Sequence, residues 1–367
     1  MSAVSYIVDK KDDTHHNVME FVLRNVDVSI ANAIRREILG GSIDVVGIKT
    51  EPEDDNDVII HKNTGRMHNE MLKHRMSCIP IHISDYSTMD ITKYRLELKV
   101  ENKSNTIMDV TSKDIKLYDT RINAYITDSE RDTIFPKNKL TDDYILITRL
   151  YPRKNSTSDY ESIDLESTLS LQNASISSVY NTTSSCAYSF VIDPVKQKKA
   201  WDEYKKNIHG DIEFEKKNWY VHEGKRHFKE NHYKFILETV GVYTNEEIVK
   251  KACISLKKKL DVISSLLETK TLDIKRGNTI ETSFDIVIPN DNYTIGKIIE
   301  FALYSLYFKE RSILSFVGYN KVHPHVDYGV IRVMFHKEEH DENYIYNMLP
   351  QAITSLKNLY SKIQNEI

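Results

Sequence analysis

Histidine side chains are the first groups of this sequence that could hold a metal ion or transfer a proton. His222, His227 and His232 follow one another at intervals of five residues, which places them on different faces of a helix and disfavours a shared metal ion. His323 and His325 flank a proline, but without a third ligand nearby this pattern is more typical of a turn. The histidine spacing therefore predicts no metal centre.

The cysteine and carboxylate side chains do not predict a reactive centre either. Cys78, Cys186 and Cys253 are too few and too widely spaced for a disulfide framework or a four-cysteine zinc site. The acidic run at 51–57 lacks the central glycine of a calcium loop and is interpreted as a solvated loop. The sequence contains no glycine-rich phosphate loop and no close-set aspartate triplet for two magnesium ions. We therefore expect neither a catalytic centre nor a cofactor in this chain.

The composition is that of an ordinary folded protein without a basic field. The chain has 367 residues, of which 40% are hydrophobic and 28% charged, and its formal net charge is −4. These values exclude a disordered or coiled-coil chain and suggest two or three domains. The weak negative charge gives no general attraction to DNA or to an anionic membrane. Because neither a signal-peptide core nor a run of about 20 apolar residues occurs, we expect an intracellular protein of the cytoplasm or nucleus.

Apolar periodicity predicts four helices. They cover residues 29–39, 245–267, 294–308 and about 343–365. Ser29 is the candidate N-cap of the first helix, and the three lysines at 257–259 are expected on the solvated side of the second. Pro350 lies inside the last pattern, so its first turns are expected to be kinked or to form a separate short helix.

Alternating and β-branched segments predict strands between these helices. The clearest cover residues 94–100, 144–148 and 284–288. From about 83 to 231 no long amphipathic helix interrupts the short strand patterns and polar loops, except a lysine-rich helix expected near 194–207. This stretch is interpreted as a mostly β inserted domain.

An internal repeat organises the rest of the chain. When residues 21–30 are aligned with 286–295, Asn25 falls on Asn290 and Ser29 falls on Thr294. Each copy reads as a strand, a polar turn and an amphipathic helix, followed later by another strand and a long closing helix. Such a module exposes an apolar helix face, and two copies can bury these faces against each other at about 1.5–3 kcal/mol per large side chain. Two independent domains with separate cores are the alternative.

The predicted fold class is α+β, with two modules of a short antiparallel sheet and two helices each, paired within the chain. The first module takes residues 1–82 and 232–267, the inserted domain 83–231, the linker 268–282 and the second module 283–367. The residues expected to bury the paired helix faces are Ile30, Ile34, Ile38, Leu256, Leu260, Ile295, Ile298, Ile299, Ala302, Leu303, Leu306, Ile353 and Leu356.

Two motifs of the first module resemble a known family. Residues 29–37, S-I-A-N-A-I-R-R-E, and 69–81, N-E-M-L-K-H-R-M-S-C-I-P-I, resemble the α-like assembly subunits of multisubunit RNA polymerases. The likeness is greatest to the third-largest subunit of eukaryotic RNA polymerase II and its archaeal relative. The return strand of that subunit is similar to residues 235–241.

The second module is similar to the eleventh-largest subunit of the same enzyme. Residues 291–297 resemble its E-D-H-T-L-G-N element, and 316–325 resemble its F-x-G-Y-x-x-P-H-P element. The matching turn residues of the second element are Gly318, Tyr319, His323 and Pro324. Val322 stands where the family has proline, which loosens the turn. A fusion of the two subunits resembles polymerases of nucleocytoplasmic large DNA viruses.

The resemblance implies a non-catalytic subunit that pairs its two modules into an assembly platform. The second-largest and then the largest polymerase subunit assemble on such a platform, small polymerase subunits join, and DNA is contacted only through the complex. The residues that the resemblance places at the partner-subunit interface are Asn32, Arg35, Arg36, Glu70, His74 and Arg75. The second copy has Lys297, Glu300 and Phe301 at the equivalents of the first three, so only the first copy is expected to bind the second-largest subunit. A viral origin would place the protein in the host cytoplasm and in the virion.

A stand-alone nucleic-acid-binding protein is the rival interpretation. It would use the lysine-rich segments at 196–206 and 216–226. Residues 193–232 contain ten Lys or Arg against eight Asp or Glu, a balance that does not favour nucleic-acid binding. An independent enzyme is the third option, which the missing metal-binding aspartates disfavour.

Overall fold

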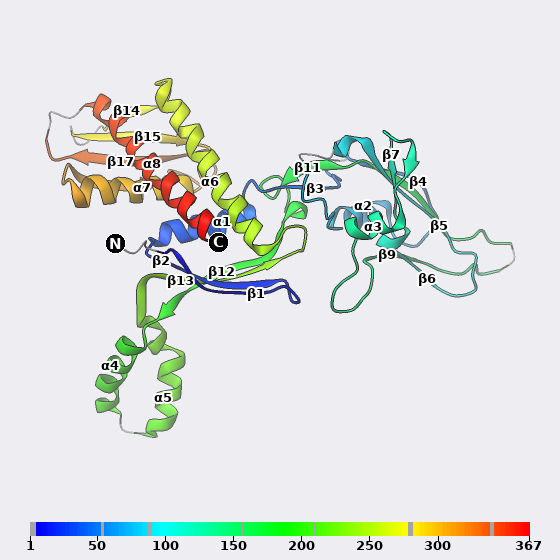
Figure 1. The fold of residues 1–367 in the computed structure, drawn as a ribbon, viewed down its shortest axis with the longest axis horizontal. Helices are drawn as coiled ribbons and strands as arrows, with labels where there is room; N and C mark the ends of the chain where they lie inside the picture. The colour runs from blue at the N-terminus through cyan, green and yellow to red at the C-terminus, as the bar shows by residue number, and fades with distance from the viewer. Residues whose placement is uncertain are drawn as a thin grey trace.

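Two antiparallel sheets of four strands each contain the segments of the internal repeat (Figure 1). The computed structural model describes residues 5–52, 55–86, 90–155, 157–208, 210–277, 282–337 and 341–367. Across the first sheet the strands are β1 (Ile7–Asp13), β2 (Val18–Arg24), β13 (Phe228–Thr239) and β12 (Thr183–Ile192). Across the second they are β14 (Ile274–Arg276), β15 (Ser283–Pro289), β17 (Tyr328–Phe335) and β16 (Leu314–Asn320). Each strand of the first sheet therefore has a counterpart at the same position in the second.

Each sheet carries a pair of helices that are also equivalent. The helices are α1 (Val28–Gly40) and α6 (Asn245–Glu268) in the first repeat, and α7 (Ile295–Leu303) and α8 (Glu342–Glu366) in the second. The α7 helix continues in π-helical turns over Tyr304–Glu310. Asn25 and Asn290, which the repeat aligns, both have a positive φ, 59° and 51°, a conformation that asparagine adopts more readily than most residues. The two repeats thus agree in strand order and in the backbone of the turn before the first helix.

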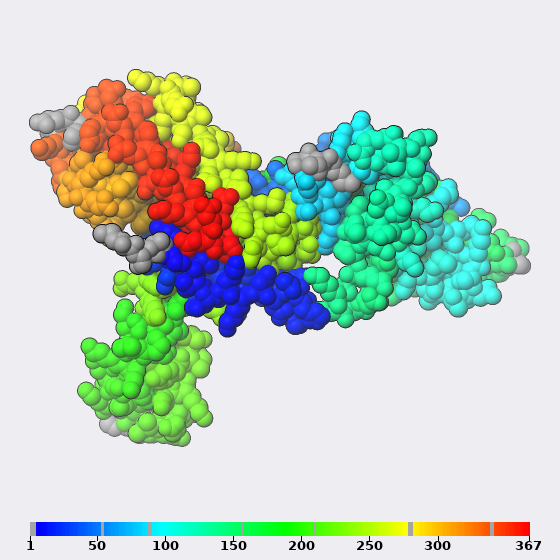
Figure 2. Space-filling model, viewed as in Figure 1, coloured from blue at the N-terminus to red at the C-terminus, as the bar shows by residue number. Residues whose placement is uncertain are grey.

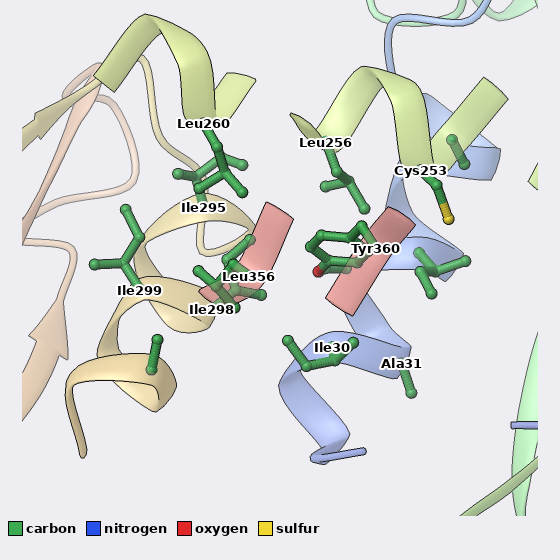
Figure 3. Close-up of a cluster of buried hydrophobic side chains, with 14 of the residues drawn as sticks. Ile30, Ala31, Cys253, Leu256, Leu260, Ile295, Ile298, Ile299, Leu356 and Tyr360 are labelled. Carbon is green, nitrogen blue, oxygen red and sulfur yellow. The ribbon is translucent and has the colours of Figure 1, made fainter. Parts of the chain in front are cut away.

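One buried cluster contains side chains of both repeats. The α6 helix packs along α8, and α1 and α7 contact these helices. Figure 3 shows Leu356 and Tyr360 of α8 among side chains of α1, α6 and α7. Every residue expected to bury the paired helix faces lies in this cluster, with Leu306 partly buried at its edge. Dispersion and hydrophobic burial therefore hold the four helices together in one core.

The inserted domain has its own antiparallel sheet and its own core. Across this five-stranded sheet the strands are β4 (Val58–Asn63), β10 (Ser162–Ser167), β5 (Tyr94–Glu101), β7 (Lys116–Asp119) and β8 (Ala124–Tyr125). Beside the sheet lie β6 (Met108–Thr111), β9 (Leu146–Leu150), α2 (Asn69–Ser77) and α3 (Asp128–Ile134). Two short strands, β3 (Asp44–Gly47) and β11 (Ser170–Asn173), pair where this domain joins the repeats (Figure 1). The core of the domain is a second buried cluster between Val46 and Leu169.

The boundaries of the inserted domain differ from the expected 83 and 231. The β4 strand and the α2 helix, which precede residue 83, pack in the inserted domain. The β12 strand, which lies within the expected insert, pairs with β13 in the first repeat. Alternating side chains identify a strand but not the sheet that it joins. The sequence therefore did not show which of these segments belong to the inserted domain and which to the first repeat.

A helical hairpin is a second insertion into the first repeat. It lies between β12 and β13 at residues 193–227 and contains α4 (Pro194–Tyr204) and α5 (Ile212–Val221). Only the first of these helices was expected from the sequence. In the second repeat the equivalent strands, β16 and β17, are joined by residues 321–327 alone. The hairpin stands away from the rest of the molecule (Figure 2).

Several local expectations differ from the structure. The cap of α1 is Asp27, whose carboxylate accepts from the Ser29 backbone N–H at 2.8 Å, and not Ser29 itself. Lys257 and Lys259 do not both lie in solvent, because Lys257 Nζ donates to Gln364 Oε1 in α8 and Lys259 pairs with Glu37 in α1. The α8 helix continues through the expected proline kink as one helix.

Short helical turns and the expected linker complete the description. The 3₁₀ turns cover Ile91–Lys93, Ser112–Asp114, Ser178–Tyr180, Lys205–Asn207 and Glu223–Arg226. The expected linker at 268–282 includes β14, and its residues 278–281 lie outside the described residues. In the described part of the chain no helix is long and apolar enough to cross a membrane.

Candidate functional site

A groove of about 980 Å³ lies between the two repeats. Its floor is the turn at 25–29 that begins α1. One wall is α7 with its π-helical extension, and the other is formed by β12 and the start of β13. Side chains that line these walls are Tyr188, Glu230, Asn231, Thr294, Lys297, Phe301, Tyr304 and Lys309. The groove therefore needs both repeats to exist.

The floor of the groove presents an exposed valine and an unpaired hydroxyl. Asp27 fixes the start of α1, so Val28 becomes the first helical residue and remains 42% exposed. The Ser29 Oγ atom is buried and has no hydrogen-bond partner within the described ranges. Buried hydroxyls are normally hydrogen-bonded. This turn therefore carries a buried hydroxyl whose desolvation is not compensated within the described residues.

The α7 wall is held by Asp291, a buried carboxylate. It accepts hydrogen bonds from the backbone N–H groups of Asn292 at 2.9 Å, Ile295 at 3.0 Å and Gly296 at 2.8 Å. These are N–H groups at the start of a helix, which lack partners within it. Asp291 thus caps the start of α7, where Thr294 makes no side-chain capping hydrogen bond.

Tyr319 of β16 also binds the turn at the start of α7. Its hydroxyl accepts from the Tyr293 backbone N–H at 3.3 Å, and burial, reinforced by the nearby Asp291 carboxylate, raises the Tyr319 pKa well above its ordinary value. A Cβ atom at Gly296 would overlap the Tyr319 ring, so glycine is required for this approach. The sequence motif that contains Tyr319 therefore positions one wall of the groove.

The rest of that motif is arranged as a turn. Gly318 lies beside the Phe316 ring. His323 and Pro324 are exposed in the connection after β16, where His323 Nδ1 accepts from the His325 backbone N–H at 3.1 Å. Within the described residues no three His, Cys, Asp or Glu side chains are placed to hold a metal ion together.

The two arginines expected at a partner interface bind within the chain. Arg36 Nε donates to Thr294 Oγ1 at 3.0 Å and Arg36 Nη2 donates to the Asn292 carbonyl at 2.7 Å, so Arg36 joins the two repeats. Arg35 donates to Asn32 Oδ1 through Nε and Nη2, at 3.0 and 2.9 Å. Arg36 and Asn32 nevertheless line the groove. The Arg36 guanidinium is therefore already engaged within the chain, and a contact of these residues with a partner subunit stays a prediction.

The second group of expected interface residues lies elsewhere. Glu70, His74 and Arg75 are exposed on α2, and Arg75 Nη2 donates to the Leu146 carbonyl at 3.0 Å. The α2 helix packs in the core of the inserted domain, whereas α1 packs in the core of the repeats. Figure 1 shows these helices in different parts of the molecule. The structure therefore does not bring the two predicted groups into one site.

Sequence reasoning missed a buried ion pair behind the groove. Glu37 is 2% exposed, and its Oε2 accepts from Lys259 Nζ at 2.7 Å. Its Oε1 accepts from the Ser42 backbone N–H at 2.9 Å and from Ser255 Oγ at 2.6 Å. Glu37 follows Ile34 by three residues, so it lies on the apolar face of α1. A carboxylate on that face was the sequence feature that could have predicted a buried ion pair. The pair fixes α1 against α6.

The groove has the mixed apolar and charged lining that is common in protein interfaces. Its walls combine large apolar side chains, such as Phe301 and Tyr304, with the charged pair of Lys297 and Glu300. Aromatic side chains with a polar rim are typical of protein interfaces. We find no nucleophile within hydrogen-bond reach of a base among the groove residues that the structure describes.

Two comparisons place the chain among known proteins. Residues 20–260 match the model of the RNA polymerase Rpb3/Rpb11 dimerisation domain. This range contains most of β2, α1, the inserted domain, the hairpin and most of α6. A curated protein of Tetrahymena thermophila described as "Conjugation stage-specific protein" is 31% identical over 109 residues, which are 26% of this chain and 33% of that protein. The match thus spans about a third of the length of this relative.

Proposed function

Because the chain belongs to the RNA polymerase Rpb3/Rpb11 dimerisation-domain family, we propose that it is a polymerase assembly subunit in which both halves of an α-like heterodimer are fused. The observation that carries the proposal is the shared core of the two repeats. Helices α1 and α6 of the first repeat pack with α7 and α8 of the second. The two sheets have the same strand order. In this proposal the second repeat, from about residue 283, takes the part of the eleventh-largest subunit.

Fusion changes how the platform forms. Two separate subunits must meet by diffusion, whereas two halves of one chain face an effective concentration on the order of millimolar. Polar contacts between the repeats then fix how the two halves pair. Arg36 of α1 binds the turn before α7, and Lys357 of α8 pairs with Asp261 of α6. A fused platform is therefore complete as soon as the chain has folded.

The groove is the proposed docking site for the second-largest polymerase subunit. It presents Val28, Lys297 and Phe301 to one occupant. The largest subunit and small subunits then join the complex, and the chain itself performs no catalysis. Support comes from the difference between the two repeats at the groove. Arg36 of the first repeat corresponds to Phe301 of the second, so the two repeats offer a partner different chemistry.

A charge placed on the floor of the groove tests this proposal. Val28→Glu adds a carboxylate at the first residue of a helix, where a negative charge is tolerated or favourable, so the chain should fold normally. In the bound state the carboxylate would be desolvated, and we expect binding of the second-largest subunit from the same source to weaken by roughly tenfold or more. Affinity is measured with the purified subunits.

The matched control is Val262→Glu. Val262 is also a helical valine, 58% exposed on α6 and outside the groove. It should leave the affinity unchanged. Equal affinities of Val28→Glu and the unmodified chain would exclude the groove as the docking site, and no binding by the unmodified chain would refute the assembly function.

A further inference from the structure

The helical hairpin at 193–227 is a separate structural unit. Its ends are joined by a hydrogen bond from the Asp193 N–H to the His227 carbonyl at 2.9 Å. Asp193 and Asp211 cap its two helices. Between the helices, the rings of Trp201 and Trp219 lie 5.6 Å apart. These two tryptophans belong to neither of the two large buried clusters.

The first repeat does not need the hairpin in order to fold. The second repeat has the same strand order but joins the equivalent strands with residues 321–327 only. The hairpin therefore adds surface and not core. What that surface offers must be read from its exposed side chains.

Large apolar side chains face solvent on the hairpin. Phe214 is 64% exposed and Val221 is 54% exposed. They are seven residues apart on α5, which places them on one face about 10 Å apart along the helix, with Lys217 between them. Val195 on α4 is 79% exposed. Exposed apolar side chains gathered on one small unit are typical of protein docking surfaces.

The hairpin carries a small positive charge, because residues 193–227 contain nine Lys or Arg and seven Asp or Glu. Lys205 pairs with Asp202 and Arg226 pairs with Glu223, and Asp193 and Asp211 accept from helix N–H groups. The lysines that remain without a carboxylate partner in the described residues are Lys196, Lys198, Lys199, Lys206, Lys216 and Lys217, with Lys225. The hairpin carboxylates that neither cap a helix nor pair with a cation in the described part of the chain are Glu203, Glu213 and Glu215. Lysines therefore outnumber carboxylates among the side chains left outside these pairs and caps.

The hairpin is continuous with the groove. Tyr188 of β12 and Glu230 and Asn231 of β13 line one wall of the groove, and these are the strands from which the hairpin projects. A subunit seated between this wall and α7 lies next to the base of the hairpin. The groove and hairpin can thus bind one partner at two places.

We infer that the hairpin is a second docking arm for the subunit that occupies the groove, and that it binds an acidic segment of that subunit carrying apolar side chains. The inference rests on the proposed function, because it takes the occupant to be the second-largest polymerase subunit. Apolar contacts to Phe214 and Val221 supply affinity, and the lysines attract the acidic segment and raise the association rate.

The test exchanges the hairpin for the loop of the other repeat. In the first variant, residues 193–227 are replaced by the seven residues 321–327, K-V-H-P-H-V-D. A second variant, Phe214→Ser with Val221→Ser, keeps the hairpin and removes its apolar face. Ile122→Ser is the control, because Ile122 is 66% exposed in the inserted domain. Circular dichroism and thermal melting establish that each variant is folded.

Affinity for the purified second-largest subunit is the readout. We expect both hairpin variants to bind roughly tenfold more weakly, and Ile122→Ser to bind like the unmodified chain. Lys216→Glu with Lys217→Glu should slow association and reduce its dependence on salt.

The outcomes separate this inference from the function on which it rests. If Val28→Glu abolishes binding but all hairpin variants bind normally, the docking arm is wrong and the assembly function stands. If the unmodified chain does not bind the subunit, both are wrong. If the loop exchange instead removes binding to a duplex DNA probe, or converts a dimer of this chain to a monomer, while subunit affinity is unchanged, the hairpin serves another occupant and the inference is overturned.

Discussion

Tyr360 offers a sharp test of the core that the two repeats share. It lies on α8 in the second repeat and is fully buried among side chains of α1, α6 and α7 (Figure 3). Its hydroxyl has no hydrogen-bond partner in the described part of the chain. Burial raises the Tyr360 pKa well above its ordinary value, and the nearby Cys253 and Glu37 add to this effect. The hydroxyl is therefore neutral and desolvated without compensation.

The magnitude follows from the cost of burying such a group. An unsatisfied buried hydroxyl costs about 1–3 kcal/mol in proteins. Tyr360→Phe removes the hydroxyl and keeps the ring, so packing is preserved and the free energy of unfolding should rise by about 1 kcal/mol. For domains of 150–250 residues this corresponds to an increase in Tm of roughly 2–4 °C.

Tyr243 provides the control with the opposite sign. It is equally buried in the same cluster, but its hydroxyl donates to the Asp44 carbonyl at 2.7 Å. Tyr243→Phe therefore loses a hydrogen bond and should lower the free energy of unfolding by about 0.5–1.5 kcal/mol.

Urea denaturation of the three proteins measures both changes. The same substitution should move the midpoint upward at one position and downward at the other, with an unchanged slope. If Tyr360→Phe destabilises the chain as much as Tyr243→Phe does, the Tyr360 hydroxyl must have a partner, and the described packing of α8 against the first repeat is wrong.

Three further predictions concern the core, the thiols and the groove. Ile299→Asp should cost several kcal/mol and prevent soluble folding, because it buries an unpaired carboxylate in the shared core; soluble, cooperatively melting protein would contradict this. Burial raises the pKa values of Cys186 and Cys253 to about 12, whereas the thiols of the unfolded chain ionise near 9. Their contribution to the free energy of unfolding is therefore complete below pH 9 and is lost as pH rises toward 12, which denaturation across this range measures. In the native protein at pH 8, only the exposed Cys78 should react with a thiol reagent. Phe301→Arg should give the second repeat a copy of the Arg36 contact, preserve or raise Tm, and weaken binding of the second-largest subunit by blocking the groove; undiminished binding would argue against that groove as the site.

The repeat and its helices could be predicted from sequence because their apolar spacing is strong. The predicted helix at 245–267 differs from α6 by one residue, and the aligned Asn25 and Asn290 have the same backbone conformation. The α5 helix was missed because its apolar residues do not fall on one face: Phe214 and Val221 point away from the buried Trp219. Such a helix is stabilised by a local aromatic contact that periodicity does not reveal.

The groove could be predicted only in part, because its walls come from distant segments. Asn32 and Arg36 lie in a recognisable motif on α1. Tyr188 and Glu230 reach the same groove through the pairing of β12 with β13 and of β13 with β2, and no local pattern specifies that register. The partner of Arg36 was missed for a related reason: the motif on α1 does not specify which distant segment of the chain packs against it.

The two repeats differ at equivalent positions beside the turns that begin their first helices. Equivalent positions hold Arg36 in the first repeat and Phe301 in the second. Arg36 satisfies the turn before α7 through Thr294 and the Asn292 carbonyl. Phe301 has no donor to offer the equivalent turn before α1, and there the Ser29 hydroxyl stays unpaired within the described residues. One of two related turns is therefore closed by a side chain of the other repeat, whereas the other turn keeps a buried hydroxyl without a partner in the described part of the chain.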